Sequence, residues 1–307
     1  VFEHMKKALI TGANGFIGSL LVEELLKNNV EVIAADLQGH NDKVPPQARF
    51  VDFDMHNCGQ LAEKITDRDI DVMFHMAWAG SSGAARGDYA LQLDNVKHTC
   101  DMVKVAAEMG IKRFVGAGTL AQLDGMSYIP ENLSTPNLVS CYGSAKTAAQ
   151  FMSKAVANSV GIEHIWCYIS NIYGIGDTTN NFINFACRMM INGERASFTA
   201  GQHNYDFVYI TDTIKGLYLC GENGIPNCSY YIGSGKARKL KDFIKIMRDN
   251  IDHDIPLFMG EVPFNGISLP LEKFSCENIK KDTGYSAEVD FEVGIKRTIK
   301  WLLEVEK

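Results

Sequence analysis

The sequence predicts an α/β protein built on a Rossmann-type, doubly wound parallel sheet, with a smaller C-terminal region. Three observations support this fold class: short apolar runs alternate with helical stretches, a glycine-rich turn joins the first run to a helix, and the alternation stops after Asn171. Strands buried on both faces of a parallel sheet form such apolar runs, and crossover helices separate them. With 307 residues, the chain is long enough to bury a large core.

Runs rich in Val, Ile or Phe are expected to form the strands of this sheet, at residues 7–10, 30–35, 49–51, 71–76, 113–115 and 164–169. Apolar residues that recur every three or four positions predict helices at residues 17–27, 91–109, 144–159, 240–251 and 293–303. The Rossmann domain is therefore expected to span residues 6–174, with a later return around 206–233. The smaller region is expected at residues 175–205 and 234–307.

Composition and charge exclude several classes of protein. The formal net charge is −7 and the sequence has no dense Lys/Arg run, so a nucleic-acid partner is not expected. Since no stretch of about 18 uninterrupted apolar residues occurs, we expect no membrane association and a cytoplasmic location. The eight cysteines show no CxxC pair, which predicts reduced thiols and no metal site.

A glycine-rich turn follows the first expected strand. It reads TGANGFIG over residues 11–18, with Gly12, Gly15 and Gly18 in GxxGxxG spacing. Glycines let the backbone turn tightly and approach a pyrophosphate, while the N-terminus of the next helix offers free N–H groups. Because this spacing differs from the GxGxxG of two-domain dehydrogenases, the turn alone also fits a structural loop without a ligand.

Asp36 makes a dinucleotide the favoured interpretation of this turn. It ends the second expected strand, where a carboxylate can accept hydrogen bonds from the adenosine ribose hydroxyls. A carboxylate repels the 2′-phosphate of NADP, and residues 37–40 contain no Arg or Lys. The sequence therefore predicts NAD as cofactor, with NADP less favoured, held by Asp36 together with Gly12, Asn14, Gly15, Phe16, Ile17 and Gly18.

Tyr142 and Lys146 are candidates for catalysis. They stand four residues apart at the start of an expected helix, hence on one face of it. A free phenol is a poor base at neutral pH, but a neighbouring ammonium and a nicotinamide cation favour the phenolate. Tyr142 could then take a proton from a substrate alcohol. Tyr and Lys also occur at this spacing by chance, so the pair alone is a weak signal.

Together these features resemble the extended short-chain dehydrogenases/reductases, including the NAD-dependent nucleotide-sugar epimerases and dehydratases. The resemblance covers nearly the whole chain. Its motifs are TGANGFIG, Asp36, FDM at 53–55, HMA at 75–77, NV at 95–96, the strand that ends in Thr119, YGSAK at 142–146, SNIYG at 170–174 and YDFVYITD at 205–212. The resemblance implies an enzyme with a nucleotide-sugar substrate, which the smaller C-terminal region helps to bind.

The resemblance also implies roles for individual residues. Thr119 would be catalytic with Tyr142 and Lys146, because its hydroxyl can hydrogen-bond the reacting oxygen. Lys146 would also hold the nicotinamide ribose. Further cofactor contacts are implied for Asp54 and Met55, near the adenine, and for Met76, Ala77, Trp78, Asn95 and Tyr142. Substrate contacts are implied for Gly80, Ser81, Thr119 and Asn171. Thr119 and Asn171 also fit ordinary polar residues at strand ends.

The chain departs from the family pattern at two places. Leu120 and Ala121 stand where the family's dehydratases carry an Asp-Glu pair, and Leu120 stands where related 3,5-epimerases carry a Cys, which argues against both reactions. Tyr205 stands where the family usually has an Arg that pairs with the nucleotide diphosphate, and no second Arg occurs among residues 261–271. Cations that could replace these residues, each of which also fits a surface charge, are Lys236, Arg238, Arg188 and Arg195.

The preferred function is a nucleotide-sugar 4-epimerase: hydride leaves C4 to NAD, Tyr142 takes the O4 proton, the ketone turns over, and hydride returns to its other face. The alternative is an NAD(P)H-dependent reductase of a 4-keto-6-deoxy nucleotide sugar. A catalytically silent dinucleotide-binding subunit is a third possibility, disfavoured because Thr119, Tyr142 and Lys146 are all present. The family resemblance also implies a homodimer formed through the helices at residues 91–109 and 144–159.

Overall fold

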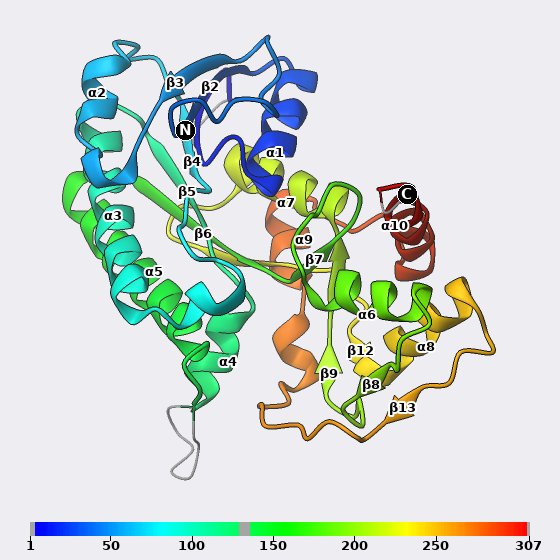
Figure 1. Cartoon of the computed structure of the whole chain (residues 1–307). Coiled ribbons are helices and arrows are strands. Elements are labelled where there is room, and N and C mark those ends of the chain that lie inside the picture. The colour runs from blue at the N-terminus through cyan, green and yellow to red at the C-terminus, as the bar shows by residue number, and fades with distance from the viewer. Residues whose placement is uncertain (1–3, 129–135, 306–307) are drawn as a thin grey trace. The chain divides into compact units, whose positions relative to one another are not determined.

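The computed structural model describes residues 4–128 and 136–305 and confirms the expected fold class. Its central sheet has seven parallel strands in the order β11-β6-β5-β4-β1-β2-β3 (Figure 1). Their bounds are β1 Lys7–Thr11, β2 Glu31–Asp36, β3 Arg49–Asp52, β4 Val72–His75, β5 Arg113–Ala117, β6 Glu163–Ile169 and β11 Ser229–Ile232. The order reverses between β1 and β4, which makes the sheet doubly wound.

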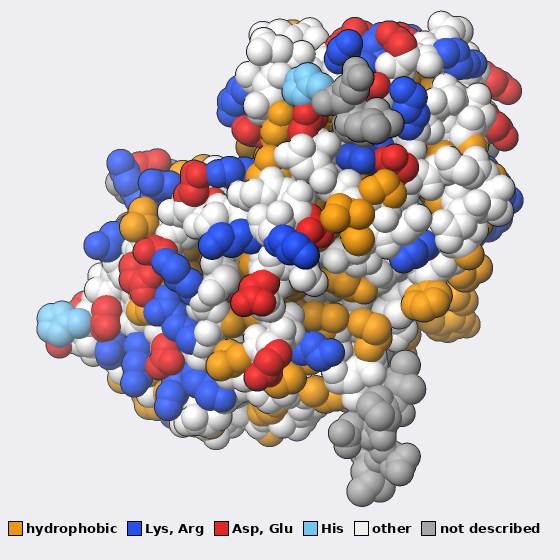
Figure 2. Space-filling view, turned by 180° about the vertical axis from the view of Figure 1, so that it is seen from behind, with side chains coloured by type: hydrophobic (Ala, Val, Ile, Leu, Met, Phe, Trp, Pro, Cys, Tyr) orange, Lys and Arg blue, Asp and Glu red, His pale blue; other side chains and the backbone are white. Residues whose placement is uncertain are grey.

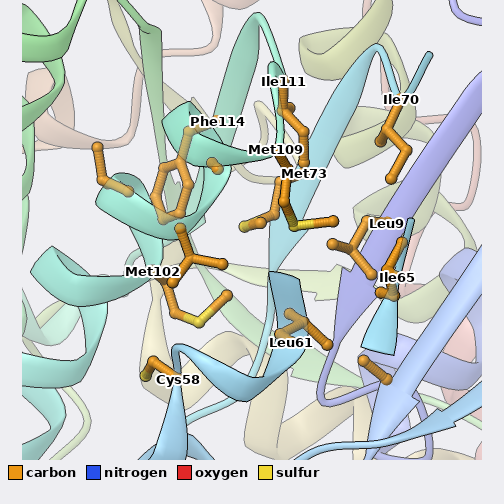
Figure 3. Packing of buried hydrophobic residues seen from close by; sticks show 14 of the residues in the cluster. Leu9, Cys58, Leu61, Ile65, Ile70, Met73, Met102, Met109, Ile111 and Phe114 are labelled. Carbon is orange, nitrogen blue, oxygen red and sulfur yellow. The ribbon is translucent and has the colours of Figure 1, made fainter. Parts of the chain in front are cut away.

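Helices cover both faces of this sheet. On one face, α2 (Gln60–Lys64), α3 (Tyr89–Glu108) and α5 (Ser140–Val160) enclose the main hydrophobic core, part of which Figure 3 shows. Met73 and Phe114 of the sheet lie in this core with Met102 of α3. On the other face, Gly221 of α7 (Ile210–Asn223) packs so closely on the Phe74 ring that a Cβ at Gly221 would lie 2.3 Å from Phe74 Cζ. Burial on both faces explains why the strands are continuous apolar runs.

The chain divides into two compact units. The first contains residues 1–169, 214–232 and 277–285, and includes α1 (Phe16–Lys27), α4 (Ala121–Tyr128), α9 (Glu277–Thr283) and the short 3-10 helices η1 (Met55–Asn57) and η2 (Gly83–Gly87). The second contains residues 170–213, 233–276 and 286–307. The helices that lie within the second unit are α6 (Phe182–Ile191), α8 (Leu240–Ile251), α10 (Phe291–Val305) and η3 (Leu271–Phe274).

The second unit is held together by short strand pairs and an aromatic core. Its strands β7 (Asn171–Tyr173) with β10 (Phe207–Tyr209), β8 (Ser197–Phe198) with β13 (Phe258–Met259), and β9 (Asn204–Tyr205) with β12 (Arg238–Lys239) form three two-stranded ladders. Phe207 lies at the centre of the aromatic cluster, 5.0 Å from the Phe243 ring and 5.7 Å from the Phe291 ring, between centroids. These contacts join β10, α8 and α10.

Within the described residues, no helix has both the length and the apolar character that crossing a membrane requires. On the face drawn in Figure 2, Lys and Arg side chains are interspersed with Asp and Glu side chains. That pattern differs from the continuous basic surface typical of nucleic-acid binding.

Candidate active site

The glycine-rich turn lies at the point where the strand order of the sheet reverses. Gly12 directly follows β1, and Met76 and Ala77 follow the adjacent β4. Gly12 has φ 71°, and a Cβ there would lie 2.7 Å from the amide nitrogen of Ala77. Only glycine fits this close approach. Ligands of doubly wound sheets bind in the crevice at such a reversal, outside the carboxyl ends of the strands.

The turn passes directly into helix α1, with Gly15 as its N-cap and Phe16 and Ile17 in its first turn. A Cβ at Gly18 would lie only 2.0 Å from the Gly12 carbonyl oxygen, so the helix can approach the turn this closely only with glycine. No side chain of residues 4–128 or 136–305 caps the N-terminus of α1. Its first N–H groups therefore remain available to a phosphate.

Asp36 ends β2, as the sequence predicts, and connects the strand to the turn. One carboxylate oxygen accepts a hydrogen bond from the Asn14 amide at 2.8 Å, and the other accepts one from the Leu37 amide at 2.8 Å. The Asn14 side chain also bonds the loop after β2, since it donates to Asp42 and accepts from the Lys43 amide, each at 2.8 Å. Asp36 and Asn14 therefore order the turn that is expected to hold a dinucleotide.

Asp54 and Met55 lie beside this strand end. The amide of Phe53 donates to the Asp36 carbonyl at 2.7 Å, which brings the chain after β3 next to Asp36. Asp54 caps η1, where its carboxylate accepts from the His56 amide at 2.9 Å, and this bond holds the pKa of Asp54 below its usual value. Met55 is half-buried against the main core. Their expected role near the adenine stays a prediction.

Residues after β4 form a segment anchored to α3 by two amide side chains. Asn95 accepts a hydrogen bond from the Ala79 amide and donates to the Ala79 carbonyl, both at 2.9 Å. Gln92 accepts from the Trp78 indole at 2.9 Å and donates to the carbonyls of Gly80 and Ala85 at 3.0 and 3.1 Å. The structure thus gives buried Asn95 a supporting role for the segment that carries Trp78.

Gly80 and Ser81, the expected substrate contacts in this segment, differ in their surroundings. Gly80 has φ 68°, and a Cβ there would lie 2.7 Å from the Leu91 side chain. Ser81 is exposed. Their roles toward a substrate remain predictions.

Thr119 and Tyr142 are brought together by a close helix contact. A Cβ at Gly143 would lie 2.3 Å from the Ala121 carbonyl oxygen, so glycine at this position lets α5 approach the start of α4. Thr119 lies just before α4, and Tyr142 lies in the first turn of α5. A side-chain hydrogen bond joins Thr119 and Tyr142. The glycine inside YGSAK therefore has a packing reason that the sequence did not reveal.

Tyr142 and Lys146 are both buried in this site. Burial raises the pKa of Tyr142, whereas the charge of Arg86 and the hydrogen bond with Thr119 lower it. The Lys146 ammonium donates to the Ala117 carbonyl at 2.6 Å and lies 3.7 Å from the Trp78 ring centroid. Burial lowers the pKa of Lys146 to about 7. Trp78 also meets the Tyr142 ring edge-on, with 6.1 Å between centroids.

A buried amide network that the sequence analysis missed supports Thr119. Gln122 accepts hydrogen bonds from the Thr119 amide and the Trp166 indole, both at 3.0 Å. It donates at 2.9 Å to Gln150, which also accepts from the Tyr168 hydroxyl at 2.8 Å. Glutamines have no local sequence pattern that marks such a role, and only the packing of α4 and α5 on β6 brings these residues together.

The remaining expected substrate residue, Asn171, lies in β7 of the second unit. Its side-chain amide donates to the Asp206 carbonyl at 3.1 Å, beside the Ser170 hydroxyl, which donates to the same oxygen at 2.9 Å. Tyr205 lies in β9, directly opposite Arg238 in the antiparallel register with β12. Since opposite residues in a ladder project to one face, Arg238 shares the face on which the family's Arg would stand.

The other candidate cations differ from Arg238 in their surroundings. Lys236 is ion-paired with Asp290, and Arg195 is ion-paired with Glu261. Arg238 pairs with Glu292 at 2.9 Å, but its Nε is buried and has no hydrogen-bond partner among the described residues. Of these three cations, Arg238 is the one with a buried donor that has no partner among the described residues.

Comparison with known proteins identifies the family. Residues 8–233 match the model of the NAD dependent epimerase/dehydratase family. A Methanocaldococcus jannaschii protein provisionally named UDP-glucose 4-epimerase is 29% identical over 96% of this chain and 97% of its own length. The dTDP-6-deoxy-L-talose 4-dehydrogenase (NAD(+)) of Aggregatibacter actinomycetemcomitans is also 29% identical, over 77% of this chain and 87% of its own length.

Among solved structures, the UDP-glucose 4-epimerase of Thermotoga maritima has the same fold. It superposes with a TM-score of 0.82 at 20% identity, covering 98% of this chain and all of that chain. The family match confirms three expectations from the sequence: the resemblance, the enzymatic class and NAD as cofactor. The chain belongs to the NAD-dependent epimerase/dehydratase family.

Proposed function

We propose that the protein is an NAD-dependent nucleotide-sugar 4-epimerase that acts by transient oxidation at C4. The observation that carries this proposal is the constellation of Thr119, Tyr142 and Lys146. It contacts Trp78, which directly follows the Ala77 that packs against Gly12, and it lacks the acidic pair expected of a dehydratase at Leu120 and Ala121. Two relatives at 29% identity have names that place the chemistry at C4, one as an epimerase and one as a dehydrogenase.

The residues around the turn fit a dinucleotide. The close approach at Gly12 and the uncapped N-terminus of α1 suit a pyrophosphate, and Asp36 suits ribose hydroxyls. Trp78, with Met76 and Ala77, would border the nicotinamide half, and Lys146 would reach its ribose. When bound there, NAD supplies the hydride acceptor.

The chain's own side chains would carry the proton transfer. Tyr142, as phenolate, would take the proton from the C4 hydroxyl and later return it to O4. Thr119 would donate a hydrogen bond to the same oxygen and stabilise the charge that develops on it. Because Tyr142 is buried, the proton would be held away from bulk water between the two half-reactions.

A reductase of a 4-keto-6-deoxy nucleotide sugar is the second candidate. It would use the same three residues, and the relative named dTDP-6-deoxy-L-talose 4-dehydrogenase favours it. The two functions differ in redox balance: an epimerase regenerates its cofactor in each turnover, whereas a reductase consumes one reduced cofactor for each product molecule.

The deciding experiment supplies UDP-, GDP-, CDP- and dTDP-sugars in turn and follows both the sugars and the cofactor. Interconversion of two C4 isomers with catalytic NAD and no net NADH formation is the expected result. Stoichiometric oxidation of NADH with a 4-keto sugar would instead establish the reductase. A chain that binds NAD but turns over none of these sugars in either direction would contradict both enzyme proposals.

We further propose that Arg238 binds the nucleotide diphosphate in place of an Arg at position 205. The support is its position opposite Tyr205 and its buried, unpartnered Nε. Since a charge-assisted hydrogen bond contributes about 1.5–3 kcal/mol, Arg238→Met should raise KM for the nucleotide sugar by about tenfold to a hundredfold. The measurement is steady-state kinetics with the substrate found above.

Arg248→Met is the matched control for this substitution. Arg248 also lies in the second unit and is bonded to Asp249, so its removal changes the net charge equally. The KM of Arg248→Met for the nucleotide sugar should equal that of the wild type. If the KM of Arg238→Met also equalled the wild-type value, the diphosphate would not contact Arg238.

The expected homodimer is also a proposal, supported by apolar side chains on α3 and α5. Tyr89 and Leu93, one helical turn apart on α3, are 68% and 61% exposed, and Phe151 and Met152 of α5 are 77% and 54% exposed. Exposed apolar side chains on two helices that pack together are typical of an interface. Sedimentation should give a dimer that Phe151→Glu dissociates; a wild-type monomer at micromolar concentration would refute it.

A further inference from the structure

Arg86, which has no role in the sequence analysis, lies against the candidate catalytic tyrosine. The guanidinium carbon of Arg86 is 4.5 Å from the centroid of the Tyr142 ring. Its Nε is buried and donates a hydrogen bond to no group in the described part of the chain, although buried donors of proteins are normally satisfied. A cation over an aromatic face is attracted to the ring, and more strongly to a phenolate, which carries a full negative charge.

The segment that presents Arg86 is fixed at both sides. Before it, Gln92 donates to the Gly80 and Ala85 carbonyls, at 3.0 and 3.1 Å. After it, the Asp88 amide donates to the Ala85 carbonyl at 3.2 Å, and the Asp88 carboxylate caps α3 by accepting from the amides of residues 90 and 91, each at 3.1 Å. Such anchors keep a long side chain in one place at low entropic cost.

Three titratable side chains bear on the charge around Tyr142: Arg86 of η2 over its ring, Lys146 one helical turn further along α5, and Asp124 of α4, which interacts with Arg86. The Lys146 ammonium donates to the Ala117 carbonyl at 2.6 Å, and burial lowers its pKa to about 7. Burial raises the pKa of Asp124 to about 6, against the lowering effect of Arg86. Arg86 alone of the three is charged at every relevant pH.

We propose that Arg86 is a positioning residue for Tyr142, whose guanidinium on the ring face stabilises the phenolate and so prepares Tyr142 to accept the substrate proton. This inference rests on the proposed function, in which Tyr142 is the base. In this arrangement Arg86 acts on the phenol ring, whereas the Lys146 ammonium contacts the Ala117 carbonyl and the Trp78 ring. The charge effect that Arg86 exerts on the pKa of Tyr142 has the required direction.

The test measures the ionisation of Tyr142 directly. Near-ultraviolet absorption follows tyrosinate formation with pH, and subtracting the titration of the same protein with Tyr142→Phe isolates this residue. Removing an opposite charge at this distance should raise the pKa of Tyr142 by about one to three units in Arg86→Gln. Arg86→Lys, which keeps the charge, should shift it less. The pH profile of kcat should move to higher pH in the same order.

Arg49→Gln is the control. Arg49 is half exposed and ion-paired with Asp67 in the first unit, so its removal changes the net charge equally but should leave the Tyr142 titration unchanged. Circular dichroism checks that each variant is folded, and Arg86→Lys gives the answer if Arg86→Gln does not fold. A Tyr142 titration that is identical in wild type and the Arg86 variants overturns the inference. Because this readout needs no substrate, failure of the proposed function alone would leave the titration result intact.

Discussion

Tyr142→Phe is expected to lower kcat by about 10²- to 10⁴-fold, the range typical of losing a general acid–base group. The substitution removes only the phenol oxygen. The ring is buried and packs edge-on against Trp78. Phenylalanine keeps the buried ring and this contact, so the fold and the glycine-rich turn should be unchanged. Steady-state kinetics on the identified sugar pair, together with calorimetric titration of NAD, measures the two effects separately.

Tyr89→Phe is the matched control, because it removes a phenol oxygen from an exposed residue of the same unit. Its kcat should equal that of the wild type. A Tyr142→Phe variant that retained kcat within tenfold of wild type would rule out Tyr142 as the essential base. If Tyr142→Phe also changed no activity of the chain or of a complex that contains it, this would support the third function, a catalytically silent dinucleotide-binding subunit.

Much of the fold could be predicted because the sheet is buried on both faces. Continuous apolar runs mark such strands, and the six expected ones all form, with ends that differ by one or two residues. Strand β11 was missed: Ser229–Ile232 is short, it follows the region where the alternation stops, and it pairs with β6, which ends sixty residues earlier in the chain. Pairing between such distant segments leaves no local pattern.

The candidate site likewise contains residues marked by local motifs and residues brought together only by distant contacts. The turn at residues 11–18, Asp36 and the Tyr142–Lys146 pair could be found because each is a short motif with its own physical reason. Arg86 and Gln122 could not, because they act through contacts with segments far along the chain. The hydrogen bond from the Lys146 ammonium to the Ala117 carbonyl also has no local sequence signal.

Acid pH should destabilise the protein strongly through His75. This side chain ends β4 and is buried between two hydroxyls, with Nδ1 2.8 Å from Thr11 Oγ1 and Nε2 3.4 Å from Thr99 Oγ1. Burial lowers its pKa to about 3, with smaller contributions from the charges of Lys146 and His98. An unfolded histidine takes up its proton near pH 6.5, so the unfolded chain binds more protons than the fold between these two values.

The sign of the change in stability with pH follows from this difference in proton binding. The stability that neutral His75 contributes is fully present above about pH 6.5 and is lost as the pH falls toward 3. A difference of about 3.5 pKa units corresponds to about 5 kcal/mol in the free energy of unfolding. Urea titrations across this pH range should show that the stability advantage of wild type over His75→Gln shrinks by an amount of this order, since glutamine does not titrate.

His164 is a second buried histidine, and burial lowers its pKa to about 4, but it is present both in wild type and in His75→Gln. Its acid effect therefore cancels in the comparison of wild type with His75→Gln. Exposed His253→Gln should follow the wild-type curve. Parallel stability curves for wild type and His75→Gln would show that His75 accepts its proton without unfolding.

Because His75 bonds Thr11, the residue just before Gly12, its protonation should also loosen the glycine-rich turn. Bound NAD should therefore protect the protein against acid.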